Sequence, residues 1–160
     1  LGSPLNRSLM DRPYSECFQM AAEGFSCVAE ACATHEVVLC IEPLSPSQTD
    51  FISSASEGDR LVQAVNHPNF GLHLDASALR EETDSPSSTI AHTSMPHHFH
   101  ANDPGLTPPG TSTDDLPAML ATLRAKNYTG YISIETLAHD SPAIEVVTNA
   151  VAYVRQAIET

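Results

Sequence analysis

The sequence has few basic residues, with 7 Lys and Arg against 20 Asp and Glu, and its formal net charge is −13. Such a chain repels phosphate backbones, so we do not expect it to bind nucleic acid non-specifically. It also lacks any apolar run of the roughly 18 residues that a membrane-spanning helix needs, so we expect no membrane segment. Residues 1–4 lack an initiator Met and both the basic and the apolar stretch of a signal peptide. We expect them to follow a segment that has been cut off.

Zinc-binding patterns of the paired CxxC type are missing as well, because the four cysteines are spaced too irregularly. Cys17 and Cys32 lie on an apolar helical stripe and Cys40 lies in an apolar run, which favours buried, reduced thiols and a cytoplasmic protein. The chain does contain enough apolar sequence for one domain, since 41% of its 160 residues are hydrophobic and 17% are charged. That composition excludes a disordered acidic chain.

Short apolar runs alternate with longer amphipathic segments. We expect strands at residues 37–41, 70–75, 97–101 and 131–134, the first of them buried on both faces. Helices are expected at 15–34, at 56–65, from Thr113 or Asp114 to about 126, and from 141 onward, with one short helical piece inside a polar loop at 80–95. The last helix should bury a stripe of Val147, Val151, Val154 and Ile158. This alternation is typical of βαβ units, and hence of an α/β protein with a parallel sheet.

An ionisable residue ends or follows each predicted strand, namely Glu42, Asp75, His100 and Glu135. Because the C-terminal ends of the strands in a parallel barrel face one mouth, we expect these side chains to converge. Three carboxylates and one imidazole suit a divalent cation, with Mn²⁺ or Mg²⁺ favoured and Co²⁺ or Zn²⁺ also suitable. Taken singly, a carboxylate at the end of a strand is more often a solvated loop residue or a helix cap than a metal ligand. A single histidine is likewise more often packed against other side chains than bound to a metal. The repeated placement is what favours a cation site.

Five motifs surround these positions. They are Gly2-Ser3-Pro4 with Arg7, Cys40-Ile41-Glu42-Pro43-Leu44, the run from His67 to Asp75, the run from His98 to Pro104 with Pro109-Gly110, and Gly130-Tyr131-Ile132-Ser133-Ile134-Glu135. In order and spacing they resemble the motifs of the xylose-isomerase-like TIM barrels, the sugar phosphate isomerase/epimerase superfamily. Tagatose and psicose 3-epimerases belong to that group, and the resemblance extends from end to end of the chain.

The resemblance implies that residues 1–160 are the C-terminal part of a single (β/α)₈ TIM barrel, with strands five to eight present and the N-terminal strands missing. It implies that Glu42, Asp75, His100 and Glu135 bind a divalent metal, and that Glu42 and Glu135 are also the catalytic acid and base. A sugar would lose a proton to one carboxylate, pass through an enediolate and regain a proton from the other. The implied activity is therefore a metal-dependent isomerase or epimerase for a free or phosphorylated sugar.

Several positions depart from the tagatose-type epimerases, in which a His, a Glu and an Arg contact the substrate. Ala78, Gln48 and Leu106 stand at these positions here, so the resemblance does not define the sugar. Candidate substrate contacts are Arg7, Gln48 and Asp103. Arg7 would equally be a surface residue, and Asp103 would equally orient His100 or be a plain loop residue.

Two further histidines, His73 and His98, stand two residues before Asp75 and His100 in their strands. Side chains two residues apart in a strand point to the same face, so both rings should face the barrel interior. We expect them to pack there or to support the metal ligands rather than to bind the metal directly.

A full barrel needs about 250 residues, and an open half would expose two sheet edges and an apolar inner face. We therefore expect either a truncated chain or a natural half that closes against a partner, a second copy of itself included. Three other functions are compatible with the motifs. They are a hydro-lyase of the inosose dehydratase kind, a phosphodiester hydrolase like endonuclease IV, which the charge of −13 opposes, and a relic without catalysis.

Overall fold

Four parallel strands form the centre of the molecule, in the same order as in the sequence. The structure is a computed structural model that describes residues 1–112, 115–137 and 140–159. Its strands are β1 (Leu39–Ile41), β2 (Phe70–Asp75), β3 (His98–Ala101) and β4 (Tyr131–Ile134). Parallel neighbours need a crossover connection, and each connection here contains at least one helix, as the alternating pattern predicts. The α/β prediction is therefore confirmed.

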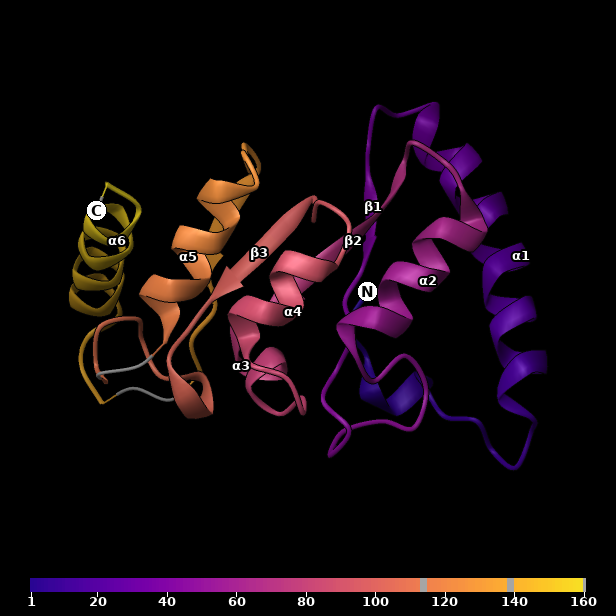
Figure 1. Cartoon of the computed structure of the whole chain (residues 1–160), viewed down its shortest axis with the longest axis horizontal. Helices are drawn as coiled ribbons and strands as arrows, with labels where there is room; N and C mark the ends of the chain where they lie inside the picture. Colours follow the sequence, from indigo (N-terminus) through magenta and orange to yellow (C-terminus); the bar gives the residue numbers. More distant parts are fainter. Residues whose placement is uncertain (113–114, 138–139, 160) are drawn as a thin grey trace.

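The helices surround the sheet in an arc, with α1 and α6 at opposite ends of the molecule (Figure 1). The α-helices are α1 (Tyr14–Ala33), α2 (Ala55–Val65), α3 (Ala76–Arg80), α4 (Pro86–His92), α5 (Leu116–Ala125) and α6 (Ala143–Glu159). Two short 3₁₀ turns are η1 (Pro4–Asn6) and η2 (Pro104–Leu106). The expected helices at 15–34 and 56–65 form as α1 and α2, and the helical piece in the polar loop forms as α4. The predicted cap at Thr113 or Asp114 lies outside the described residues.

Helix α3 is absent from the sequence prediction. It begins directly after β2, where the Asp75 side chain accepts a hydrogen bond from the Ala78 main-chain N–H at 3.0 Å. The last residue of the strand is therefore also the N-cap of the helix. With only five residues, α3 is too short to produce the periodic apolar pattern by which a longer helix is recognised.

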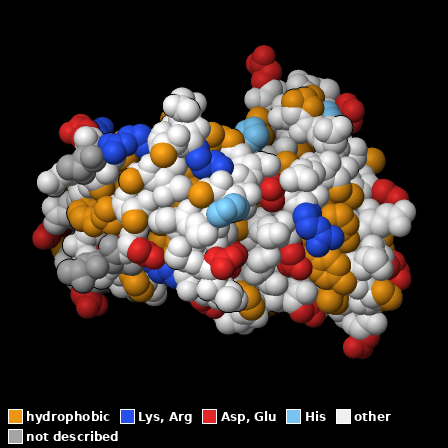
Figure 2. All heavy atoms as spheres, viewed as in Figure 1, with side chains coloured by type: hydrophobic (Ala, Val, Ile, Leu, Met, Phe, Trp, Pro, Cys, Tyr) orange, Lys and Arg blue, Asp and Glu red, His pale blue; other side chains and the backbone are white. Residues whose placement is uncertain are grey.

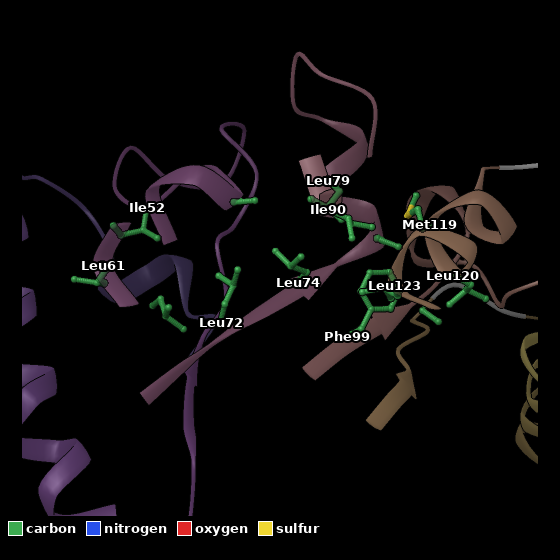
Figure 3. Close-up of a cluster of buried hydrophobic side chains, with 14 of the residues drawn as sticks. Ile52, Leu61, Leu72, Leu74, Leu79, Ile90, Phe99, Met119, Leu120 and Leu123 are labelled. Carbon is green, nitrogen blue, oxygen red and sulfur yellow. The ribbon is translucent and has the colours of Figure 1, made fainter. Parts of the chain in front are cut away.

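The main hydrophobic core lies between the sheet and the helices. Its strand residues alternate along the chain and so point to one face, while the helices supply the other half. Figure 3 shows Leu72, Leu74 and Phe99 from the strands packed with Leu61, Leu79, Ile90, Met119, Leu120 and Leu123 from the helices. We call this the outer face of the sheet.

The opposite face of the sheet, which we call the inner face, is polar. Along β2 and β3 it carries His73, Asp75, His98 and His100, in register across the two strands. The prediction of an apolar inner face is therefore wrong. The physical reason is that the apolar positions of each strand face the helices, and the alternate positions carry the ionisable groups.

Two segments beside the edges of the sheet are more exposed than the sequence predicts, because an edge strand has fewer neighbours to cover it. Val37 and Val38 precede the edge strand β1 and are 49% and 41% exposed, so this segment is not buried on both faces. In α6 the buried residues are Val146, Ala150 and Val154, so that Val154 of the predicted stripe is buried as expected, whereas Val147 is 50% and Ile158 36% exposed. Val147 and Val151 of the predicted stripe line a hollow of about 510 Å³ beside β4, the strand at the other edge of the sheet.

The four cysteines form no disulfide, as predicted for reduced thiols, but none of them is fully buried. Cys17, Cys32 and Cys40 are partly covered and Cys27 is exposed. Burial is incomplete because α1 and β1 lie at one end of the described sheet, where β1 has no further strand beyond the start of the chain. Among the described residues, no helix combines the length and the apolar character that crossing a membrane would require.

The start of the chain lies along the outer edge of β1. The Leu1 amino group donates to the Cys40 carbonyl at 2.7 Å, and the Glu42 N–H donates to the Leu1 carbonyl at 3.3 Å. Two hydrogen bonds arranged in this way follow the pattern of a parallel neighbour. At Gly2 any larger residue would place its Cβ against the Glu42 carboxylate, so that the Glu42 side chain would have to move away from its present position.

Candidate active site

Four ionisable side chains meet at the C-terminal ends of the strands. Glu42 and Glu135 directly follow β1 and β4, Asp75 ends β2, and His100 lies in the second half of β3. One ligand atom from each lies within 4.8 Å of the others. The sequence expectation that these four side chains converge therefore matches the geometry, although they are separated by 33, 25 and 35 residues in the chain.

His100 lies at the centre of the four side chains. Its Nδ1 atom is 3.2 Å from Glu135 Oε2 and 3.7 Å from both Glu42 Oε1 and Asp75 Oδ2. Burial raises the pKa of Glu42, and the nearby Asp75 and Glu135 raise it further, while His100 lowers it. Three carboxylates around one imidazole thus leave an excess of negative charge that a cation would neutralise.

The donor set itself fits a divalent metal ion. Oxygen ligands with one nitrogen suit Mn²⁺ or Mg²⁺, and the four donors come from the ends of all four strands. Burial favours the protonated form of Glu42 by raising its pKa, whereas a metal binds the carboxylate form, so metal affinity should rise with pH. The chemistry and the placement of the residues therefore fit the predicted metal site.

A buried chain of polar contacts supports Asp75. Asn102, fully buried, donates from Nδ2 to Asp75 Oδ2 at 2.8 Å and accepts at Oδ1 from Arg80 Nη1 at 3.3 Å. Arg80 Nε in turn lies 3.0 Å from Asp115 Oδ1. Sequence reasoning missed this role of Asn102, although the residue stands two positions after His100 and therefore on the same face. Nothing in the sequence around Arg80 points to its contact.

The two further histidines face the inner side of the sheet, as their positions in the strands predict. His73 is 6% exposed and packs edge-on against His100, with ring centroids 4.0 Å apart. His98 lies 5.1 Å from His73 and 5.2 Å from His100 by the same measure. Burial, and secondarily the neighbouring imidazoles, lowers the pKa of His73 to about 3, and the same two causes lower that of His98. Both rings are therefore neutral near pH 7.

The three residues predicted to contact substrate, Arg7, Gln48 and Asp103, make hydrogen bonds to other groups of the protein. Arg7 Nη1 donates to the main-chain carbonyl of Glu42 at 2.7 Å, and its Nη2 donates to that of Leu1. Gln48 is exposed and accepts a hydrogen bond from Ser45 of its own loop at 3.3 Å. Arg7 thus joins the ends of two neighbouring segments beside Glu42, and Gln48 stabilises the loop that follows β1.

Asp103, the third of these residues, is fully buried. Its Oδ2 atom accepts from the main-chain N–H groups of Thr111 and Ser112, both at 2.8 Å. It therefore holds the loop between β3 and α5 in place. The contacts of Arg7, Gln48 and Asp103 leave the three substrate-binding assignments as predictions.

Acidic and basic side chains are interspersed over the face of the molecule seen in Figure 2, and the basic ones do not gather in one patch. A nucleic-acid interface usually presents a continuous basic stripe or patch. The face seen in Figure 2 shows no such patch.

The chain matches a known family over almost its whole length. The family model described as "Xylose isomerase-like TIM barrel" matches residues 3–159. A probable ketose 3-epimerase from Synechocystis sp. is 27% identical over 115 residues, which are 71% of this chain and 40% of that protein. The D-psicose 3-epimerase of Agrobacterium fabrum is 28% identical over 120 residues, or 74% of this chain and 41% of that one. The chain thus spans about two fifths of these relatives.

The fold is also similar to that of solved structures. A crystal structure of a D-psicose 3-epimerase, determined in the presence of D-fructose, superposes with a TM-score of 0.84 at 22% sequence identity. The superposition covers 94% of this chain and 60% of that one. At this identity the likeness concerns the fold, and it places the four β/α units of this chain within a larger barrel of the same type.

Proposed function

This chain belongs to the xylose isomerase-like TIM barrel family, and we propose that it supplies the metal-binding part of the active site of a sugar isomerase or epimerase. The observation that carries the proposal is the convergence of Glu42, Asp75, His100 and Glu135 within 4.8 Å. The relatives named for ketose and psicose 3-epimerisation support the substrate class, a small sugar. The free cysteines agree with the cytoplasmic location that we propose for it.

The four converging residues would hold the metal, for which we propose Mn²⁺ or Mg²⁺, with Co²⁺ or Zn²⁺ as alternatives. When bound, such a cation polarises a carbonyl and a neighbouring hydroxyl of a sugar, and so acidifies the C–H bond beside the carbonyl. Asp75 is held for ligation by its hydrogen bonds to Asn102 and to the Ala78 N–H. This orientation limits its freedom before any ligand arrives.

Glu42 and Glu135 would carry out the proton transfers. They extend from the two edge strands, β1 and β4, and therefore approach a substrate at the barrel mouth from opposite sides. One carboxylate takes the proton from carbon, which leaves an enediolate, and the other returns a proton to the opposite face to give an epimer. Return at the neighbouring carbon gives an isomer instead. The raised pKa of Glu42 brings it closer to neutral pH, where a general acid or base works best.

We further propose that this chain forms strands five to eight of the barrel and that four more β/α units close it. Both edge strands lie beside apolar hollows, one of about 720 Å³ next to β1 and α1 and one of about 510 Å³ next to β4 and α6. Met20 and Phe25 line the first hollow, and Ile132 and Val147 line the second. A parallel β/α unit added at each edge would cover these side chains. A second copy of the chain is the alternative occupant.

Proton exchange tests the proposed activity. The protein is incubated with Mn²⁺ and candidate ketoses in D₂O, and deuterium at carbon is followed by NMR. We expect deuterium beside the carbonyl together with an epimer or isomer. An unsaturated product would instead indicate the hydro-lyase, which uses the same carboxylates. Absence of exchange with every ketose and inosose tested would contradict both activities.

Mn²⁺ binding tests the site independently of the sugar. We expect Asp75→Asn to abolish binding measured by the EPR signal of free Mn²⁺, because a ligand is lost. Asn102→Ala should weaken binding by about 10–100-fold, since it removes only the partner that orients Asp75. Asp84→Asn is the matched control, because Asp84 is an exposed carboxylate outside the site. Equal binding by Asp75→Asn and the control would rule out the metal site and favour a relic without catalysis.

A further inference from the structure

Three imidazole rings lie close together on the inner face of the sheet, next to the carboxylate site, and His73 Nδ1 lies 3.8 Å from Glu42 Oε1. His73 on β2 is paired in register with His98 on β3, and His100 lies two residues further along β3. One nitrogen atom from each ring lies within 4.8 Å of the other two. We call these residues the three-histidine set. Only His100 belongs also to the carboxylate site described above.

Packing alone does not account for the three-histidine set. His73 is 6% exposed, yet its Nε2 atom is buried without a hydrogen-bond partner among the described residues. A buried polar atom left unpaired costs about 1–3 kcal/mol. An apolar side chain would fill the same space without that cost. The unpaired Nε2 atom belongs to a ring that packs against two more imidazoles, which makes it a candidate metal ligand.

The chemistry of the set differs from that of the carboxylate site. Three imidazoles with an open fourth position make a nitrogen-rich site of the kind that Zn²⁺ and Cu²⁺ favour, whereas the carboxylate oxygens favour Mn²⁺ or Mg²⁺. Ligand atoms around one zinc ion lie closer together than 4.8 Å, since Zn–N bonds are about 2.0–2.1 Å long. Binding would therefore have to draw the three rings closer together. His98 is only half-buried, whereas His73 and His100 already pack against each other with ring centroids 4.0 Å apart.

We propose that His73, His98 and His100 form a second cation site, selective for Zn²⁺ or Cu²⁺, that competes with the carboxylate site for His100. A neutral imidazole has one nitrogen with a free lone pair, because the other carries the proton. His100 can therefore serve one ion at a time. Zinc in the three-histidine set would take His100 from the proposed catalytic ion and so inhibit the enzyme. This consequence for activity rests on the proposed function, whereas the site itself does not.

Displacement of Mn²⁺ by Zn²⁺ tests the competition. The protein is loaded with Mn²⁺, Zn²⁺ is added stepwise, and released Mn²⁺ is measured by EPR. Substitution His73→Phe keeps a ring of similar size but removes both nitrogens. We expect this variant to need at least about tenfold more Zn²⁺ than the wild type to release half of its Mn²⁺. His35→Gln, at an exposed histidine far from the set in the sequence, should behave like the wild type.

A variant that releases Mn²⁺ at the wild-type Zn²⁺ concentration would overturn the proposal, because zinc would then be replacing manganese at the carboxylates alone. Circular dichroism shows whether His73→Phe is folded. If it is not, the variant His98→Gln is used in its place, since His98 is partly exposed and its replacement should disturb the fold less than that of His73. The same shift in Zn²⁺ concentration is expected.

The Cu²⁺ spectrum separates this proposal from the proposed function. Cu²⁺ bound to three imidazoles shows EPR splitting from three nitrogens, and His73→Phe should reduce the number. If the protein binds no Mn²⁺ but gives the three-nitrogen spectrum, the proposed enzyme site fails and the three-histidine set stands. If it binds Mn²⁺ and Cu²⁺ shows one nitrogen or none, the three-histidine set fails alone.

Discussion

The two faces of the sheet are built from alternate residues of the same four strands, yet they have opposite properties. On the outer face, Leu72, Leu74 and Phe99 are at most 1% exposed and pack against helices. On the inner face, Asp75 and His100 belong to the candidate active site. The comparison shows that adjacent residues in one strand contribute either to stability or to chemistry, because successive side chains point in opposite directions.

The two faces also differ in how their polar groups are satisfied. The outer face needs no hydrogen bonds because its side chains are apolar. The inner face holds carboxylates and imidazoles at short range, and burial raises the pKa of Glu42 while lowering that of His73. A face with such groups is stable only if a ligand or a neighbour compensates for their charge, so substitutions on the two faces should have different consequences.

The largest expected effect is on the outer face. Phe99→Ala removes a fully buried ring and should destabilise the protein by about 3–5 kcal/mol, whereas His98→Ala, one residue earlier on the inner face, should cost about 1 kcal/mol or less. Urea unfolding of the two variants measures the difference. Equal losses would mean that the inner face is packed as tightly as the outer face.

A smaller effect should appear in the pH dependence of the metal-free protein. Because the pKa of Glu42 is raised on folding, its contribution to stability is fully present below the usual carboxyl value of 4.5 and is lost as pH rises through the raised value. The urea midpoint should therefore fall over this range. Glu42→Gln resembles the protonated side chain and should reduce the fall. If the urea midpoint falls with pH equally steeply in the wild type and in Glu42→Gln, then Glu42 does not cause the fall.

The smallest effect is expected for a large aromatic residue of the inner face. Tyr131 pairs in register with His98 and is 84% exposed. Its replacement by Ala should change the free energy of unfolding by no more than about 0.5 kcal/mol. The same urea titration compares it with Phe99→Ala. The small effect is expected for residues 1–160 alone, and a loss of several kcal/mol for Tyr131→Ala would show that a second copy of the chain covers Tyr131 in solution.

Most of the fold could be predicted from local patterns. The strands and the long helices appear where alternating and helical periodicities place them, since both periodicities follow from backbone geometry. The four strand-end residues could also be predicted, because the ends of parallel strands always lie on one side of a sheet. Helix α3 could not, because five residues are too few for a periodic signal. The contact of Asn102 with Asp75 likewise joins residues that no local pattern connects.

The sequence by itself determined which residues alternate, where each strand ends and which ionisable group stands there. Only the tertiary structure decided that Val146 rather than Val147 is buried, and that Arg7 donates to main-chain carbonyls beside Glu42. The physical reason is that periodicity depends on neighbours along the chain. Burial and hydrogen bonding depend on neighbours across the sheet. Among the described residues, β4 has a strand on one side only, and β1 has on its outer side only the start of the chain.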